Sequence, residues 1–369
     1  MNLLKSTSVL VLGLMTLGLA AETPSDCASG QVFTSSNAQA GNELLVYSRN
    51  HDGTLTFKSH LPTGGQGSGA GLGSQGAVTL SLDGEYLFVV NAQSNSVSTF
   101  ALHGNAPKLT SVLASGGTHP ISVTEHDGLV YVVNDGGISN VTGFRNSHGI
   151  LKAVPGSTLG LSKPSGAAPA QIGFSADGAT LVVTEKGTNL LTSYQVIHGG
   201  GITGPLSTLS PGQTPFGFAF NRHNRLLVTE AVGGTPGAST VSSYRIAHAS
   251  PASLQIVSPA VPDDQTAACW IAITPNGRFG YVANTGSSSV SSYHIAFDGQ
   301  IDLMAMVAGA TGTGSAPADA AISSDGHHLF VRNGRSFTLS SFDIHKDGSL
   351  SAGILTSGLP TSAVGLAAN

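Results

Sequence analysis

A short apolar segment that ends in Asn or Glu occurs seven times along this chain of 369 residues. The seven segments are residues 32–37, 87–91, 130–134, 181–185, 226–230, 281–284 and 329–333. Their last residues lie between 43 and 54 positions apart. A repeat of this length, built from short strands, is typical of the four-stranded blades of β-propellers. The sequence therefore predicts an all-β fold, a seven-bladed β-propeller.

An aromatic residue follows each segment about ten positions later. These residues are Tyr47, Phe100, Phe144, Tyr194, Tyr244, Tyr293 and Phe342. Such an array could stack on carbohydrate, but an aromatic side chain repeated in every blade belongs more often to the core between blades. We assign these side chains to the core.

The two ends of the repeat predict how the ring closes. The chain opens on a second and a third strand, and residues 361–369 resemble an isolated first strand. Pairing the two ends in one blade would remove two exposed strand edges. Asp-Gly pairs such as Asp83-Gly84 and Asp177-Gly178 predict tight turns within the blades, because Gly accepts the positive φ that these turns require.

The first residues predict export. Lys5 precedes the apolar run 9–19, and Gly18 and Ala20 suit a cleavage site, so we interpret residues 1–21 as a secretory signal peptide. Residues 22–369 are then a single propeller domain, either secreted or periplasmic. No other segment has an apolar run long enough to span a membrane.

Charge and cysteine content limit the partners and the cross-links. The net charge of −5 argues against nucleic acid as a ligand, and we expect a monomer. Export permits a disulfide between Cys27 and Cys269, but we favour Cys269 as a small buried apolar residue.

Three of the strand ends carry a recognisable sequence. They read Tyr-Val-Ala-Asn at 281–284, Phe-Val-Val-Asn at 88–91 and Tyr-Val-Val-Asn at 131–134. With the turns described above, they resemble the YVTN-type repeats of the seven-bladed lactonase propeller family, which includes 6-phosphogluconolactonase-like proteins and 3-carboxymuconate cyclases. The resemblance covers roughly residues 30–369 and implies lactone hydrolysis or formation at one face of the channel. Glu185 and Glu230 depart from the repeat, which expects Asn at both positions.

The first strands of a propeller line its central channel, and their inward residues are predicted by alignment. Aligning these strands by their apolar centres gives two levels. The outer level holds His119, Ala170, Phe216, Cys269, Ala318, Gly76 and Ser362. The inner level holds Pro120, Gln171, Gly217, Trp270, Asp319, Ala77 and Ala363. Packing alone would favour similar residues at each level, so this mixture indicates a site.

Three residues are the catalytic candidates. Glu185 or Glu230 would act as general base toward water, and His119 would protonate the leaving alkoxide of a lactone. The alternative for each Glu is a local ion pair or a loop held by backbone N–H groups. The alternative for His119 is a structural histidine.

Eight further residues are the substrate-binding candidates: Asn134, Gln171, Lys186, Phe216, Trp270, Asn284, Asp319 and Arg332. Gln171 or Asn284 would donate to the oxyanion. Trp270 would stack on a ring or plug the channel, and Phe216 has the same two alternatives. Because few Lys or Arg side chains are predicted on this face to bind an anion, we expect a neutral or singly charged substrate.

We expect no cofactor, with one alternative. Glu185, Glu230, Asn134, Asn284 and Asp319 form an all-oxygen set of the kind that Ca²⁺ accepts. The Gly-rich segment 64–76 lacks the Lys-Ser/Thr of a phosphate-binding loop, and we interpret it as a flexible loop.

Two functions therefore follow from the sequence. The first is an exported, cofactor-free, lactonase-like enzyme that acts on a small cyclic ester. The second is a secreted or surface-bound propeller that only binds, because propellers serve both purposes. The enzyme hypothesis requires His119, Glu185 and Glu230 to surround a common point.

Overall fold

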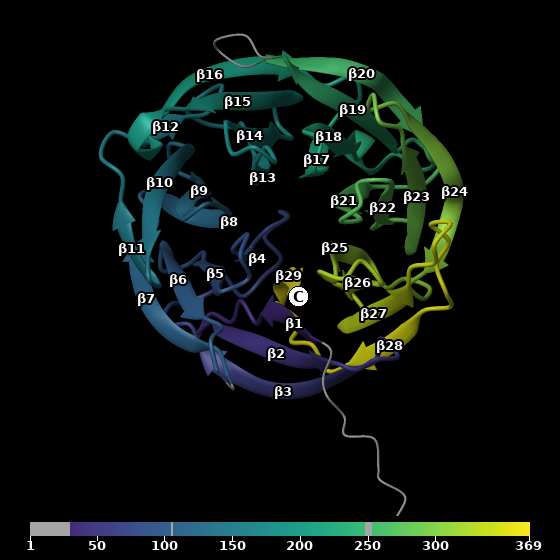
Figure 1. The fold of residues 1–369 in the computed structure, drawn as a ribbon, viewed down its shortest axis with the longest axis horizontal. Helices are drawn as coiled ribbons and strands as arrows, with labels where there is room; N and C mark the ends of the chain where they lie inside the picture. Colours follow the sequence, from purple (N-terminus) through teal and green to yellow (C-terminus); the bar gives the residue numbers. More distant parts are fainter. Residues whose placement is uncertain (1–29, 105, 248–252) are drawn as a thin grey trace, which may run out of the picture.

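Seven antiparallel β-sheets stand around a central axis in the computed structural model, which describes residues 30–104, 106–247 and 253–369 (Figure 1). The predicted all-β fold with seven blades is confirmed. Residues 1–21 and Cys27 lie outside the described residues.

The blades are numbered along the chain, and each is given from its innermost strand outward. Blade one holds β29 (Val364–Ala368), β1 (Gly30–Ser35), β2 (Glu43–Arg49) and β3 (Leu55–Pro62). Blade two holds β4 (Val78–Leu80), β5 (Tyr86–Asn91), β6 (Ser96–Ala101) and β7 (Lys108–Ala114). Blade three holds β8 (Thr118–His126), β9 (Leu129–Gly136), β10 (Asn140–Ser147) and β11 (Ile150–Ala153), with β12 (Leu159–Gly160) also paired to β10.

The remaining four blades follow the same order. Blade four holds β13 (Pro169–Phe174), β14 (Thr180–Glu185), β15 (Leu190–Val196) and β16 (Ile202–Leu209). Blade five holds β17 (Pro215–Phe220), β18 (Arg225–Glu230), β19 (Thr240–Ala247) and β20 (Ser253–Pro262). Blade six holds β21 (Ala268–Ile273), β22 (Phe279–Asn284), β23 (Ser289–Ile295) and β24 (Ile301–Ala310). Blade seven holds β25 (Pro317–Ile322), β26 (His328–Asn333), β27 (Thr338–Asp343) and β28 (Ile354–Ser357). Two 3₁₀ turns, η1 (His198–Gly200) and η2 (Val232–Gly234), lie between strands.

Blade one is completed from both ends of the chain, as predicted. The C-terminal strand β29 pairs antiparallel with β1, with Val32 opposite Ala368, and Figure 1 shows the C-terminus beside β1. The Thr34 hydroxyl donates to the Gly365 carbonyl over 2.6 Å. The closure satisfies edges that would otherwise expose unpaired backbone groups.

Polar side chains close the turns between the first and second strands. The Ser81 hydroxyl donates to Asp83 over 2.5 Å, and the Ser175 hydroxyl donates to Asp177 over 2.6 Å. The next residue, Gly84 in blade two, has φ +72°, where an L side chain would be strained. The side of the ring that carries these turns is called the turn face below. The opposite side, where linkers between blades enter the first strands, is called the linker face.

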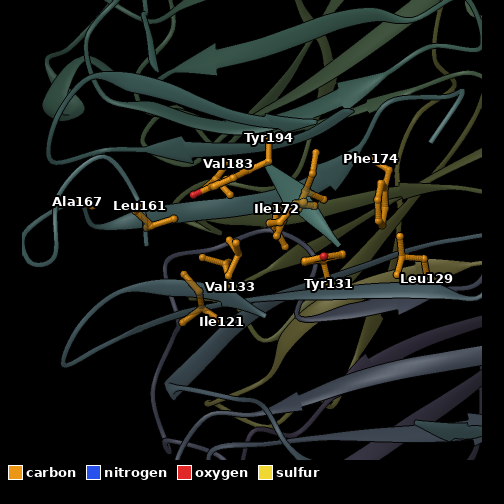
Figure 2. Close-up of a cluster of buried hydrophobic side chains, with 13 residues drawn as sticks. Ile121, Leu129, Tyr131, Val133, Leu161, Ala167, Ile172, Phe174, Val183 and Tyr194 are labelled. Carbon is orange, nitrogen blue, oxygen red and sulfur yellow. The ribbon is translucent and has the colours of Figure 1, made fainter. Parts of the chain in front are cut away.

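The repeated aromatic residues lie in the core, as predicted. None of the seven is more than 3% exposed. Figure 2 shows one core cluster, which joins blade three to blade four: Tyr131 and Val133 from β9 face Ile172 and Val183 from blade four. Such contacts between neighbouring blades make the ring a rigid frame for side chains that point into the channel.

Among the described residues, no helix is long and apolar enough to cross a membrane.

Candidate functional site

In blades two to seven, an Asn or Glu at the end of the second strand ties that strand to the third strand. In blade one, Asn37 lies beyond β1 and its amide instead donates to Ser68 and to the Ala70 carbonyl. The Asn91 side-chain amide donates to Ser96 over 3.2 Å and to Ser98 over 2.8 Å. Asn284 and Asn333 make the same two bonds, to hydroxyls five and seven residues later. The repeated Asn is therefore a structural element of the blade.

Glu185 replaces this Asn in blade four and takes over its role. Its carboxylate is fully buried and accepts from the Ser162 amide over 3.0 Å, Thr188 over 2.8 Å and Thr192 over 2.6 Å. The Ser162 hydroxyl donates as well. Thr192 lies seven residues after Glu185, as Ser98 does after Asn91. The carboxylate thus binds the third strand and the preceding linker.

Glu230 makes the equivalent set of bonds in blade five. It is fully buried and accepts from Ser210 over 2.7 Å, the Gly212 amide over 3.0 Å and Ser242 over 2.7 Å, with Thr240 as a fourth donor. These bonds support the alternative in which each Glu holds its own loop. Neither carboxylate has the free oxygen that a base in the channel would need.

His119 lies at the rim of the linker face, two residues earlier than its predicted level. Pro120 pairs with Asn134 in blade three, as Pro169 pairs with Glu185 in blade four. The equivalent of Gln171 is therefore Ser122 and not Pro120. The alignment by apolar centres failed here because it matched Ile121 to Ile172, whereas the strand register matches Val123 to Ile172. The predicted convergence of His119 with two buried, fully bonded Glu carboxylates loses its geometric basis.

Polar side chains at the inner level cap the free edges of the innermost strands. The Ser122 hydroxyl accepts from the Ile172 amide over 3.2 Å. Gln171 accepts from the Phe218 amide over 2.6 Å and donates to the Phe218 carbonyl over 2.9 Å. Innermost strands are edge strands whose backbone groups face the channel, so these side chains satisfy them. These two bonds fix the Gln171 side chain against blade five and use one of its two amide hydrogens.

Blade five lacks a side chain at this level, and a residue from blade two replaces it. Gln75, in the linker before β4, accepts from the Ile271 amide over 3.2 Å and donates to the Ile271 carbonyl over 2.9 Å. A Cβ atom at Gly217 would overlap the Gln75 side-chain oxygen. Gly217 therefore leaves the space through which Gln75 crosses the channel.

The same linker closes the channel at the linker face. The Lys186 ammonium donates to the Gly73 carbonyl over 2.6 Å, and the Trp270 indole donates to the Ser74 carbonyl over 3.1 Å. The Phe216 ring lies 4.7 Å from the Lys186 nitrogen and 5.2 Å from the Trp270 ring. In Figure 1 the chain before β4 reaches into the centre of the ring. The segment predicted as a flexible loop is thus bonded to several blades, and its bond to Trp270 favours the plugging role of that side chain over stacking on a ligand.

The remaining amide candidates are Asn134 and Asn284. In both residues the side-chain amide hydrogens already donate hydrogen bonds within the protein. The Asn134 amide donates to the Ser115 carbonyl over 3.3 Å and to Asn140 over 3.0 Å. Asn284 donates as described above, and the side-chain oxygens of both residues are buried without a hydrogen-bond partner among the described residues. Neither amide is free to stabilise an oxyanion in this structure.

Asp319 and Arg332 are buried ionisable residues on adjacent strands of blade seven, and each has a polar atom without a hydrogen-bond partner among the described residues. Asp319 is 1% exposed, and its φ of +91° is unusual for a residue other than Gly. Within the described chain, neither Asp319 Oδ2 nor Arg332 Nε has a hydrogen-bond partner. Burial raises the pKa of Asp319 to about 7, although the Arg332 charge acts in the opposite direction. Burial likewise lowers the pKa of Arg332.

A cavity of about 260 Å³ runs along the channel beside Asp319. Its walls are polar at one end, with Gln75, Gln171 and Asp319, and mainly apolar toward the turn face, with Ile322 and Leu366. A strained, buried carboxyl that titrates near neutral pH beside a cavity is typical of functional sites. Asp319 is therefore the strongest candidate for acid–base chemistry.

A larger cavity, of about 640 Å³, lies on the linker face over blade six. Thr266, Ala267, Thr285, Ser287 and Arg335 contribute to its lining, with residues 312–314. The lining contains no Asp, Glu, His, Lys or Cys. This cavity has the composition of a binding site and lacks a general acid or base.

The predicted calcium set does not gather in one place. Glu185 and Glu230 are bonded within different blades, by four donors each. Within the described ranges, no group of three or more His, Cys, Asp or Glu side chains is placed to hold a metal ion.

Comparison with known proteins agrees with this architecture. Residues 237–354 match the family model described as "Lactonase, 7-bladed beta-propeller". The resemblance to the seven-bladed lactonase propellers is confirmed. No curated protein matches the chain.

Three solved structures share the fold at low sequence identity. The periplasmic gluconolactonase of Pseudomonas aeruginosa is 16% identical, with a TM-score of 0.69 over 91% of this chain and 98% of that one. A Bacteroides fragilis protein proposed to be a 6-phosphogluconolactonase is 18% identical, with a TM-score of 0.68 over 94% and 100%. A Lactobacillus plantarum protein is 17% identical, with a TM-score of 0.71 over 92% and 99%. At such identities the likeness establishes the fold.

Proposed function

We propose that this chain is an exported, lactonase-like propeller that opens or forms a small cyclic ester in its central channel, with Asp319 as general base. The observation that carries the proposal is the Asp319 carboxyl: buried, strained and lacking a partner for Oδ2, on the wall of the channel cavity. Asp319 replaces Glu185 and Glu230 in this role, because their oxygens are already bonded.

The proposed reaction needs one water molecule and one carboxylate. Asp319 takes a proton from water as the water oxygen forms a bond to the lactone carbonyl carbon. The ring C–O bond then breaks, and the leaving oxygen receives that proton, which yields a hydroxy acid. The Arg332 charge, close enough to influence Asp319, would favour the ionised base. A cavity of about 260 Å³ restricts the substrate to a small ring.

A lactone panel read by a pH indicator tests this proposal. Asp319→Asn keeps the size of the side chain and removes the base, so we expect the rate to fall by at least about a hundredfold. Asp263→Asn is the matched control, because Asp263 is also a buried carboxyl but bonds to Ser291 and the Gln265 amide between blades. It should retain activity. Full activity in Asp319→Asn would overturn the assignment.

The same lactone panel also tests the three catalytic residues that were predicted from the sequence. Glu185→Gln, Glu230→Gln and His119→Ala are measured beside Asp319→Asn, with melting temperature as a second readout. Loss of turnover at unchanged stability in any of the three would restore that residue as a catalytic candidate. Adding EDTA tests the calcium alternative, which predicts a loss of rate.

A propeller that binds without catalysis is the second candidate. The plug formed by Lys186, Trp270 and the linker before β4 favours it, because the plug closes the linker face of the channel. Folded wild-type protein that hydrolyses none of the lactones would support this candidate over the enzyme.

A further inference from the structure

We infer that the cavity over blade six is a binding site for a small hydroxylated carboxylate, with Arg335 as its anion contact. The cavity is the larger of the two described above and is separate from the Asp319 site in its lining. This inference does not rest on the proposed lactonase reaction.

Three loops of the linker face build much of the cavity wall, and Gly234 and the linker with Thr266 and Ala267 contribute as well. One is the loop between β22 and β23, with Thr285 and Ser287; another is the linker 311–316 that enters blade seven. The third carries Arg335, whose backbone amide donates to the Ser315 carbonyl over 2.9 Å. This bond fixes the backbone of Arg335 to the linker, whereas its side chain is exposed and would be ordered only when a ligand binds.

The hydroxyl groups of the cavity are arranged as donors. The Thr266 hydroxyl oxygen accepts from the Gly237 amide over 3.1 Å, and the Ser287 hydroxyl oxygen accepts from the Thr266 amide over 2.8 Å. A hydroxyl that accepts from a backbone amide still has its hydrogen to donate. Both groups can therefore donate to oxygen atoms of a ligand in the cavity.

Among the described residues that line the cavity, Arg335 is the one that carries a formal charge. Across the residues that the structure describes, no ion pair or side-chain hydrogen bond involves its guanidinium, and no carboxylate lies in the cavity lining. A guanidinium without a protein partner, beside further donors, matches a carboxylate, which accepts two parallel hydrogen bonds. The single charge favours a monoanion.

The remaining lining limits the rest of the ligand. Val307 is 56% exposed at the cavity and, with Ala310, offers an apolar wall to C–H groups. The hydroxyl groups of the lining suit a ligand that carries several hydroxyls of its own. A hydroxy acid the size of a six-carbon sugar acid meets these requirements within about 640 Å³.

Isothermal titration of the full protein with sodium gluconate tests the inference. Glucose supplies hydroxyls without charge, and inorganic phosphate supplies charge without the carbon chain. We expect gluconate to bind most tightly. We expect Arg335→Gln to weaken its binding by at least about tenfold and Arg335→Lys to weaken it less, since Lys keeps the charge but loses the paired geometry.

Arg278→Gln is the matched control, because Arg278 lies over the Phe279 ring on another part of blade six and is not in the cavity lining. Its gluconate affinity should equal that of the wild type. Absence of gluconate binding to the wild type, equal binding of glucose, or an equal effect of Arg335→Gln and Arg278→Gln would each overturn the inference. None of these outcomes depends on lactone turnover, which the Asp319 variants report separately.

Discussion

At the scale of single residues, the position at the end of the second strand holds the third strand with either of two side chains, Asn or Glu. Asn91 uses its amide to hold hydroxyls of the third strand, whereas Glu185 holds the equivalent hydroxyl as an acceptor. Glu also reaches the Ser162 amide in the linker. A break in a sequence repeat therefore marks a change of hydrogen-bond partners here, and it does not by itself mark a catalytic group.

Removing the Glu185 carboxylate is expected to destabilise the fold. Glu185→Ala would leave Ser162, Thr188 and Thr192 without their buried acceptor, at a cost of about 3 kcal/mol or more. Glu185→Gln keeps an oxygen acceptor and should cost less. Chemical denaturation measures both, with Glu85→Ala on the surface as control, expected within about 0.5 kcal/mol of wild type. Equal stability of Glu185→Ala and Glu85→Ala would contradict the structural role.

Asp319 is expected to make stability depend on pH. Its pKa is about 7 in the folded chain and 3.8 ordinarily, so its favourable contribution is complete below about pH 4 and is lost as pH rises through 7. Asp319→Asn removes this loss. Relative to wild type, the variant should therefore gain stability between pH 4 and pH 8, by a few kcal/mol at the roughly 1.4 kcal/mol per pKa unit of linkage.

The comparison must separate Asp319 from Asp263, whose pKa burial raises to about 6. Denaturant unfolding of wild type, Asp319→Asn and Asp263→Asn at each pH provides this separation. A stability difference between Asp319→Asn and wild type that does not change with pH would show that Asp319 titrates normally.

At the scale of elements, the linker before β4 is the feature that departs most from its prediction. Its Gly-rich composition predicts a flexible loop, yet Gly73, Ser74 and Gln75 are bonded to blades four and six. Gly residues allow the backbone to lie close to neighbouring strands, because they have no side chain. Here they allow the linker to cross the channel. Propensity could not identify its partners, because they lie about 110 to 200 residues away.

Gly217→Ala tests this crossing. The added methyl group would overlap the Gln75 oxygen, so we expect a drop in melting temperature of several degrees. Gly160→Ala is the matched control, since a Cβ at Gly160 meets no atom within 4 Å. A Cβ at Gly217 would also overlap the Cys269 backbone carbonyl, which a change at Gln75 does not relieve. Adding Gln75→Ala to Gly217→Ala should therefore remove only part of the damage, so that the two changes together are less harmful than their sum but still destabilising. Additive effects would argue against contact between the two residues.

At the scale of the whole molecule, the closure of blade one holds the ring together. β29 pairs with β1 across more than 300 positions of sequence, through bonds such as Thr34 to Gly365. Deleting residues 361–369 would expose an edge of β1 and an apolar seam. We expect the truncated protein to lose its cooperative melting transition, as followed by circular dichroism. A single sharp transition near that of the full chain would contradict a closing role for β29.

The sequence by itself determined the architecture: the number of blades, the terminal closure and the buried aromatic residues. These features can be predicted from the repeat, because each blade must bury the same positions and turn at the same places. Only the tertiary structure decided the site. It placed Ser122 rather than Pro120 beside Gln171, bonded Glu185 and Glu230 away from the channel, and brought Gln75 across it. Burial and an unpaired oxygen then distinguished Asp319, and a guanidinium without a protein partner distinguished the exposed Arg335. Those properties depend on neighbours from distant blades, which no single repeat contains.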